Sequence, residues 1–374
     1  MSKKKVSIFL RAKDVCPSGY YRLLQYFYKM QDVDLTIHSV MPPSVYLWYH
    51  SHVSANRLRK LAASGFIYLL MFFSTLCALL SELFRHPDVL IVQREVLPRL
   101  SSPLHLWLLR RLARRSQLIW DFDDDIFQSG ELTQKEAKLL IEESKHIIVT
   151  SEYLRSHIPV PHLSKVMLLP TTDGDMQDIP MEQMMADRKH TFETELRMVW
   201  VATRNNIEYL VHFLPTLDEA AKRIKEQNGK QLTLEVVTSL PIPFEPKHLQ
   251  MNFHQWTHEL AIQKMVSSHI GIMPLLENPY TLGKGGFKLI QYMSVALPVI
   301  ASEVGYNSYV VDSSYGYLVP NEQPELWVEY LLKISSSWSD YLSMSTTSKR
   351  IYDEKFSYRT NYQSWLQLIQ DLRA

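Results

Sequence analysis

The sequence is poor in cysteine, and this scarcity excludes whole classes of protein. Only Cys16 and Cys77 occur among 374 residues, so we expect no disulfide framework and no cysteine metal site. We expect the protein to work in a reducing cytoplasm. Internal repeats and low-complexity tracts are also absent from the sequence. No signal peptide is visible, because the apolar run in MSKKKVSIFL is too short. A chain of 374 residues is too long for one ordinary core, which predicts two domains.

Acidic residues are scarce in the first third of the chain. Residues 1–115 carry 17 Lys and Arg against 6 Asp and Glu, or +11, and the remainder carries 23 against 33, or −10. A basic part of this size indicates an anionic partner, unless the imbalance is chance on a solvated surface. No nucleic-acid-binding module is recognisable, so we expect no nucleic-acid partner.

Short apolar strands alternate with helical stretches along the chain, which is typical of parallel βαβ units. The first six expected strands span 6–10, 35–40, 88–93, 117–122, 146–150 and 165–169. After a polar, methionine-rich stretch, six more are expected at 196–202, 232–237, 251–256, 269–274, 297–302 and 315–320. The pattern predicts an α/β fold of two tandem Rossmann-like, doubly wound domains with a cleft between them and a C-terminal cross-over helix.

Residues 61–81, LAASGFIYLLMFFSTLCALLS, contain no charged side chain. As a helix rising about 1.5 Å per residue, the stretch would be about as long as a bilayer core is thick. A membrane span is not expected, because strands of one sheet precede and follow the stretch. Two interpretations stay open: a buried crossover helix, or a helix in the membrane interface with Arg57, Arg59 and Lys60 at the headgroups. We expect 57–81 to contact a membrane surface, since one sheet cannot cover a helix that is apolar on nearly every side.

Two glycines and two lysines precede or open an apolar helix in GKGGFKLIQYMSVALPVIAS, residues 283–302. Gly285 and Gly286 let the backbone approach a ligand closely, and the helix N-terminus attracts anions. Lys284 and Lys288 add positive charge. Ligands of α/β domains bind beyond the carboxyl ends of the strands, where this loop is expected. The segment therefore predicts a diphosphate site, with a simple tight turn as the alternative.

Another expected strand is followed by Arg204, in VWVATRNNIEYL. Two cations at strand ends suit a pyrophosphate, which arginine can bind with two hydrogen bonds, although Arg204 has a surface role as its alternative. Trp256, in FHQW, is expected near a nucleobase, with a core position as the alternative.

The segment GKGGFKLIQYMSVALPVIASEVG resembles the nucleotide-sugar-binding segment of GT-B glycosyltransferases, especially the bacterial family 4 type, glycosyl transferases group 1. VWVATRNNIEYL resembles the segment that opens their second domain, where a basic residue contacts the donor diphosphate. IVQRE, IWDFDDDIF and PSGYYRLLQY are similar to segments of their first domain. The domains implied are an acceptor-binding domain with a helix that packs back on it, a linker and a nucleotide-sugar-binding domain, at 1–170 with 356–374, 171–195 and 196–355.

The resemblance implies an enzyme, a hexosyltransferase-like glycosyltransferase that moves a sugar from a nucleotide-diphosphate sugar to a glycan or lipid-linked acceptor. It implies retention of the anomeric configuration and no cofactor or metal, because lysine, arginine and a helix N-terminus neutralise the diphosphate. We expect a bacterial enzyme of cell-surface polysaccharide biosynthesis, cytoplasmic and peripherally associated with the inner face of the membrane.

One departure from the family concerns two glutamates eight positions apart, where this chain has Gly283 and Gln291. In the family the second glutamate holds the donor ribose, and Gln291 can still hydrogen-bond hydroxyl groups without charge. Glu277 is a candidate substitute for the first. The departure keeps open a catalytically inactive, GT-B-like, membrane-associated binding subunit.

The segment IWDFDDDIF places four carboxylates at a strand end, on Asp121, Asp123, Asp124 and Asp125. Such carboxylates repel one another unless cations or amides compensate them. We favour a turn and helix cap with Asp124 and Asp125 facing the cleft. The alternative is a metal-dependent glycosyltransferase that uses the Asp121–Asp125 cluster. Arg22 and Arg94 are expected to bind an acceptor phosphate or to compensate the cluster.

The expected site thus has three groups of residues and no metal ligand. For catalysis they are Arg204, Lys284 and Asp124. For the donor they are Gly285, Gly286, Phe287, Lys288, Gln291, Glu277 and Trp256. For the acceptor they are Gly19, Arg22, Arg94 and Asp125.

Overall fold

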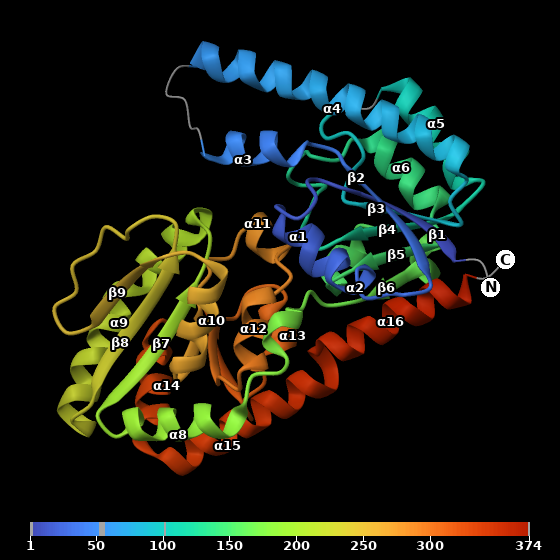
Figure 1. The fold of residues 1–374 in the computed structure, drawn as a ribbon. Helices are drawn as coiled ribbons and strands as arrows, with labels where there is room; N and C mark the ends of the chain where they lie inside the picture. Colours follow the sequence, from blue (N-terminus) through green and yellow to red (C-terminus); the bar gives the residue numbers. More distant parts are fainter. Residues whose placement is uncertain (1–2, 52–56, 101, 373–374) are drawn as a thin grey trace. The chain divides into compact units, whose positions relative to one another are not determined.

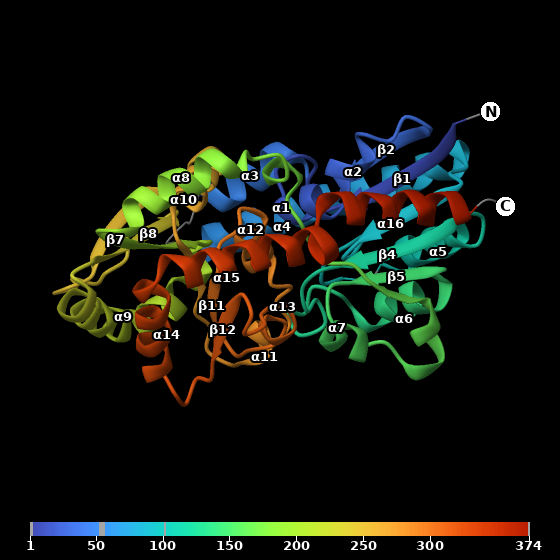
Figure 2. The same cartoon turned by 90° about the horizontal axis from the view of Figure 1, so that it is seen from below.

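A computed structural model describes residues 3–51, 57–100 and 102–372, with the backbone alone for 50–51 and 57–62. The chain divides into two compact units, drawn in Figures 1 and 2. Unit 1 comprises 1–171 and 361–374, and unit 2 comprises 172–360. Each unit is built around one six-stranded parallel sheet, which confirms the predicted fold class.

The sheet of unit 1 has the strand order β2-β1-β3-β4-β5-β6. These strands are β1 (Lys4–Leu10), β2 (Val33–Ser39), β3 (Val89–Gln93), β4 (Gln117–Phe122), β5 (His146–Val149) and β6 (Val166–Leu168). The helices are α1 (Pro17–Gly19), α2 (Gln25–Phe27), α3 (Pro43–Ser51), α4 (Arg57–Arg85), α5 (Pro103–Ala113), α6 (Gln134–Glu143) and α7 (Glu152–Ser156). All six strands expected in the first half of the sequence are present, because each is a short apolar run between polar turns.

Helices α4, α5 and α6 cover one face of this sheet (Figure 1). Leu79 of α4, Leu108 of α5 and Leu140 of α6 are buried against strand residues such as Trp120. Helix α16 (Tyr358–Asp371) brings the chain back to unit 1, where the Trp365 ring lies 5.5 Å from that of Phe27. The last helix thus completes unit 1 as a crossover from the end of unit 2.

The sheet of unit 2 has the order β12-β11-β10-β7-β8-β9. These strands are β7 (Glu195–Val201), β8 (Gln231–Thr238), β9 (Gln250–Gln255), β10 (Ile270–Met273), β11 (Val299–Ser302) and β12 (Gly316–Val319). The helices are α8 (Met181–Phe192), α9 (Ile207–Asn228), α10 (His258–Ser267), α11 (Pro279–Leu282), α12 (Phe287–Ser294), α13 (Asn307–Val310), α14 (Glu325–Ser336) and α15 (Trp338–Ile351). One core joins the sheet to α9 and α14, and another joins it to α10 and α12.

Residues 171–195 differ from the expected linker, because they contain helix α8. Met184, Arg188 and Phe192 of α8 are buried. The Arg188 guanidinium donates hydrogen bonds to the carbonyls of Met265, Val266 and Val295, at 3.1, 3.0 and 2.9 Å. The helix is therefore an integral part of unit 2, anchored by a buried arginine as well as by Met184 and Phe192.

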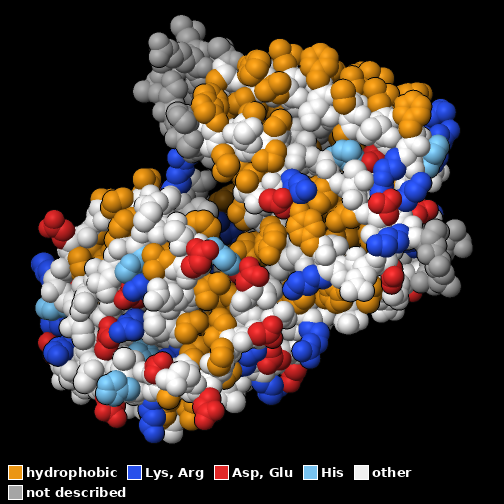
Figure 3. Space-filling model, in the orientation of Figure 1, with side chains coloured by type: hydrophobic (Ala, Val, Ile, Leu, Met, Phe, Trp, Pro, Cys, Tyr) orange, Lys and Arg blue, Asp and Glu red, His pale blue; other side chains and the backbone are white. Residues whose placement is uncertain are grey.

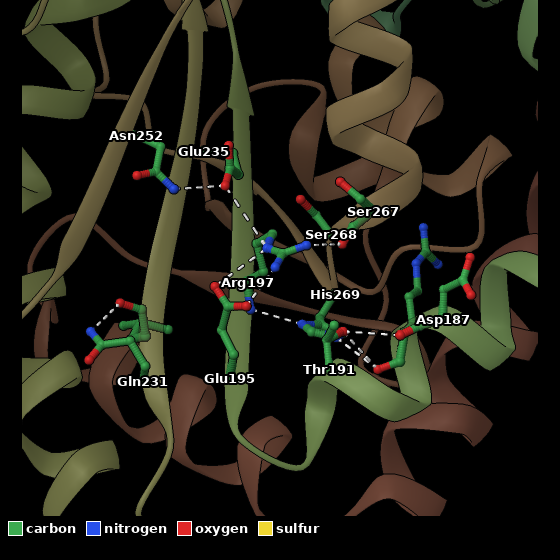
Figure 4. A network of polar contacts seen from close by, with 12 residues as sticks. Asp187, Thr191, Glu195, Arg197, Gln231, Glu235, Asn252, Ser267, Ser268 and His269 are labelled. Carbon is green, nitrogen blue, oxygen red and sulfur yellow. Dashed lines mark hydrogen bonds and ion pairs between the residues drawn. The ribbon is translucent and has the colours of Figure 1, made fainter.

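A buried polar network fixes the amino-end half of β7 and its neighbours (Figure 4). Glu235 of β8 is only 4% exposed and accepts hydrogen bonds from Asn252 and His254, and Lys264 pairs with it at 3.0 Å. Burial alone would raise the pKa of Glu235, but these hydrogen bonds together hold it below its ordinary value. The network's Glu195, Arg197 and His269 lie at the start of β7 and just before β10, so this part of the network supports the amino ends of the strands.

Helix α4 contains one stretch, Ala63–Arg85, that is long and apolar enough by length and composition to cross a membrane. Only 22% of its most apolar 18-residue window is buried. The sheet argues against a span, because β1 pairs in parallel with both β2, which precedes α4, and β3, which follows it. The helix therefore lies along unit 1 with one side uncovered.

Candidate donor site

Two loops of unit 2 meet at the carboxyl edge of its sheet. One follows β7 and contains the 3₁₀ turn Arg204–Asn206, and the other follows β10 and contains α11 and the start of α12. Because β7 and β10 are neighbours in the sheet, their ends lie side by side. Lys284 Nζ donates to Asn206 Oδ1 at 2.7 Å and lies 4.4 Å from the centre of the Tyr280 ring. Lys284 thus contacts Asn206, which follows Arg204 by two positions in the same loop.

Helix α12 starts at a backbone position that requires glycine. Gly286 has a φ of +63°, and a Cβ there would come within 2.8 Å of Tyr306 Cδ1. The amides of Leu289 and Ile290 both donate to the Gly286 carbonyl, which sets the first turn. The positive end of the α12 dipole is therefore aimed at the loop that carries Lys284 and Gly285. Phe287 and Lys288 occupy the first turn of α12 and are half-buried.

The remaining predicted donor residues are spread along the same edge. Arg204 is exposed and forms no ion pair with another described residue. Glu277 is exposed in the loop after β10, where its amide donates to Asn321 Oδ1 at 2.9 Å. Trp256 follows β9, the edge strand, and its side chain is half-exposed. Since β8 separates β9 from β7, Trp256 is the most distant of these residues along the sheet.

Gln291 is buried in α12 and bound to an acidic partner that the sequence did not suggest. Its Nε2 donates to Asp173 Oδ2 at 2.9 Å, and Asp173 is 1% exposed. Because the carboxylate accepts a hydrogen bond from the NH₂ group of Gln291, the amide oxygen Oε1 is left to accept one from a ligand. Asp173 also belongs to a group that could hold a metal ion, the only such group among the described residues, with Asp175 and His258. His258 Nε2 already lies 3.1 Å from Asp175 Oδ2.

The structure corrects the role expected for Arg22. Its side chain is 2% exposed in unit 1, and its guanidinium binds both oxygens of Asp121 and the Leu169 carbonyl. Arg22 therefore compensates a fully buried carboxylate and is not placed to bind an acceptor phosphate. Gly19 ends α1 next to β1, where a Cβ would lie 3.5 Å from Gln93 Oε1.

Asp125 of IWDFDDDIF also finds its partners within unit 1. Asp125 Oδ1 accepts from the amides of Phe127 and Gln128, and its Oδ2 lies 3.1 Å from both Tyr153 OH and His157 Nε2. Asp125 is thus a buried turn cap, which corrects its expected contact with acceptor hydroxyls. The Asp121–Asp125 alternative of a metal site finds no support, because these carboxylates form no candidate metal group among the described residues.

Asp124 remains accessible at the end of β4, whereas Arg94, after β3, keeps only 13% of its side chain exposed. Arg94 Nη2 binds Asp124 Oδ2 at 2.8 Å, and the Asp124 side chain is 48% exposed. Arg94 has a φ of +66°, in the left-handed region where residues other than glycine are uncommon. Burial and the neighbouring Asp124 raise the pKa of Asp123 to about 6, and its Oδ1 has no hydrogen-bond partner among the described residues. The sequence had indicated Asp124 and Asp125, and not Asp123, as the carboxylates that face a ligand.

Chemically, the edge of unit 2 offers a lysine, an exposed arginine and a helix N-terminus to one small region. This arrangement suits a ligand with two adjacent phosphates, since each cation can form a charge-assisted hydrogen bond. Asn206 and Tyr280, which position Lys284, were not predicted. Asn206 stands in the same TRNN segment as Arg204, so the signal was present, but its partner lies 78 residues away in the sequence.

Residues 198–337 match the family described as glycosyl transferases group 1. No curated protein matches the chain in sequence. Among solved structures, HepE from Anabaena in complex with UDP-glucose is 10% identical, with a TM-score of 0.64 over 98% of this chain and 99% of that one. A glycosyltransferase from Rickettsia africae ESF-5 is 12% identical, with a TM-score of 0.66 over 100% and 99%.

The catalytic domain of starch synthase IV from Arabidopsis thaliana, bound to ADP and acarbose, is 11% identical, with a TM-score of 0.62 over 100% of this chain and 99% of that one. Identities this low establish the fold alone, whereas the family match concerns the sequence of unit 2 from β7 to α14. Together they confirm the predicted fold class and the predicted resemblance.

Proposed function

We propose that this chain is a glycosyltransferase that uses a nucleotide-diphosphate sugar, because residues 198–337 match the group 1 glycosyltransferases and the whole chain shares the GT-B fold. The observation that carries the proposal is the contact of Lys284 with Asn206, which joins two strand-end loops beside the N-terminus of α12. HepE and starch synthase IV, which share the fold, are seen with UDP-glucose and ADP respectively.

In this proposal the work of the site is to stabilise the leaving group. As the bond between the sugar and the diphosphate breaks, negative charge grows on the phosphate oxygens. Lys284, Arg204 and the amides at the start of α12 accept that charge without rearranging. The products are a glycosylated acceptor, a nucleoside diphosphate and the proton of the acceptor hydroxyl. Retention of the anomeric configuration is proposed from the family resemblance. Gln291 Oε1 is proposed to accept a hydrogen bond from a hydroxyl group of the nucleotide sugar.

The acceptor is proposed to be a glycan or lipid-linked molecule of bacterial cell-surface polysaccharide biosynthesis. The exposed Asp124, at a strand end of unit 1, is proposed to bind it together with Arg94, which is mostly buried and pairs with Asp124. A cytoplasmic enzyme attached to the inner face of the membrane fits the uncovered side of α4. The side chains of Arg57, Arg59 and Lys60, expected at the headgroups, lie outside the described residues.

Donor binding is tested directly by thermal shift of the purified chain with UDP-, GDP-, ADP- and CMP-sugars. We expect one of the three diphosphate donors to raise the melting temperature, because a ligand that binds only the folded state stabilises it. CMP-sugars carry a single phosphate and should have no effect. Stabilisation by a CMP-sugar instead of a diphosphate donor would show that the site was misread.

Metal independence gives a separate expected result: activity should survive EDTA, because protein cations neutralise the diphosphate. The measurement is the rate of nucleoside diphosphate release with and without EDTA. Loss of activity that manganese or magnesium restores would contradict the proposal. Asp173→Asn and Asp175→Asn would then identify the group Asp173, Asp175 and His258 as the site of the metal.

A further inference from the structure

The uncovered side of α4 is apolar along its described length. Its exposed positions recur every three or four residues, which places them on one side of the helix. Phe66, Phe73 and Phe84 are 63%, 59% and 84% exposed. The exposed apolar side chains are Phe66, Leu69, Phe73, Cys77, Leu80 and Phe84, and Gly65 and Ser81 are exposed as well. From Phe66 to Phe84 this stripe is about 27 Å long at 1.5 Å per residue.

The opposite side of α4 is firmly attached to unit 1. Ile67, Met71 and Leu79 are buried, and the buried Glu82 accepts a hydrogen bond from Ser7 of β1 at 2.6 Å. The stripe therefore cannot turn into the core of its own unit. Figure 3 shows hydrophobic side chains gathered along the edge where Figure 1 places α4. A contiguous apolar surface of this length is typical of an interaction site.

Helix α5 lies against α4 and adds aromatic and basic side chains. His105 of α5 contacts α4 through its Nε2, which is 3.0 Å from both Thr75 Oγ1 and the Phe72 carbonyl. The other side of α5 exposes Leu104, Trp107 and Arg111, and Trp107 is 55% exposed. The Arg111 guanidinium lies 5.6 Å from the centre of the Trp107 ring. An exposed tryptophan beside an arginine has an apolar body and a polar end, as side chains at a membrane interface do.

The charge of this region has one sign. Residues 96–115 contain no Asp or Glu and carry Arg99, Arg110, Arg111, Arg114 and Arg115. Arg110 and Arg114 pair with acidic side chains of α6, Glu142 and Glu143. Arg111 and Arg115 are exposed and have no acidic partner among the described residues. Arg111, beside Trp107 on α5, and Arg115, in the turn that follows α5, can complement the phosphates of lipid headgroups.

We infer that α4 and α5 together form a surface that inserts into a membrane leaflet rich in anionic phospholipid. The stripe from Phe66 to Phe84 lies at the acyl boundary, Trp107 lies at headgroup level, and Arg111 and Arg115 bind lipid phosphates. The inference rests on the proposed peripheral location and deepens it, because it assigns the basic part of the contact to α5 and the turn that follows it. The sequence had suggested only residues 57–81.

The test is sedimentation of the purified full-length chain with vesicles of phosphatidylcholine, with and without phosphatidylglycerol. The wild type should bind the anionic vesicles more tightly. Arg111→Gln with Arg115→Gln should weaken that binding about tenfold or more, since each basic residue near a charged surface contributes about 1 kcal/mol. Trp107→Ser should weaken binding to both kinds of vesicle. Binding by these variants that equals the wild type would overturn the inference.

Matched controls come from unit 1 away from both helices' exposed sides. Val160→Ser removes another highly exposed apolar side chain, and Lys138→Gln removes an exposed charge of α6; both should bind as the wild type does. Brominated lipids should quench the fluorescence of the wild type more than that of Trp107→Phe. A doubled mass in light scattering that Phe73→Ser abolishes, with no vesicle binding, would make this surface a dimer interface and contradict the inference.

The failure of this inference is separable from that of the proposed function. Donor hydrolysis without vesicles should be the same in Trp107→Ser as in the wild type, because α5 belongs to unit 1 and the donor residues to unit 2. A wild type that binds vesicles but cleaves no nucleotide sugar would contradict the proposed function alone.

Discussion

Replacing Lys284 by alanine should lower the turnover of a nucleotide-sugar donor by about tenfold or more. The ammonium group is held between Asn206 Oδ1, at 2.7 Å, and the Tyr280 ring, beside the N-terminus of α12. Its removal takes away a charge-assisted hydrogen bond to the leaving diphosphate, and such bonds contribute roughly 1.5–3 kcal/mol. Because that charge is larger in the transition state than in the bound donor, we expect kcat to fall more than KM rises.

The matched control is Lys222→Ala, which removes an exposed lysine from α9 of the same unit. It should leave turnover unchanged. Arg204→Ala should resemble Lys284→Ala if the exposed guanidinium reaches the same phosphates. Normal turnover in both Lys284→Ala and Arg204→Ala, with the fold intact, would show that the diphosphate binds elsewhere.

Replacing Arg22 by alanine should destabilise unit 1 by about 3–5 kcal/mol. The substitution leaves Asp121, which is 0% exposed, without its counter-ion, and the Leu169 carbonyl without a donor. Since burial disfavours the charged form, Asp121 without Arg22 would be held protonated or would admit water. The measurement is the urea concentration at which the native signal is lost, followed by circular dichroism.

A surface ion pair gives the comparison for Arg22. Arg155 binds Glu152 at 2.9 Å, and both side chains are more than one-third exposed, so Arg155→Ala should cost about 1 kcal/mol or less. If Arg22→Ala were as stable as the wild type but failed to use the acceptor, Arg22 would have the ligand-binding role first expected from the sequence.

The strands were predictable because each is a short apolar run. Their parallel direction was predictable because a helix lies between consecutive strands. Helix α8 was missed because MEQMMADRKHTF has no clear apolar stripe and is anchored by the buried Arg188. The loop GKGG was predicted as a ligand loop from its residue types alone. The positive φ of Gly286 explains why one of those positions is occupied by glycine.

What the sequence could not provide are the pairs between distant positions. Arg22 lies 99 residues from Asp121, and Gln291 lies 118 residues from Asp173. No local pattern states whether an arginine faces a ligand or a buried carboxylate, so Arg22 was assigned the wrong one of two open roles. Likewise, the hydrophobic stretch 61–81 predicted an apolar helix, but only the packing of α4 on β1 shows which side of that helix is uncovered.

The most direct test of the central claim is the release of nucleoside diphosphate from UDP-, GDP- and ADP-sugars by the purified chain. We expect one donor to yield its nucleoside diphosphate slowly with water and faster with a suitable acceptor. Lys284→Ala should lower both rates by about tenfold or more, and Lys222→Ala should leave them unchanged. A wild type that binds a donor but never cleaves it would contradict the account and would leave a binding subunit with the same fold.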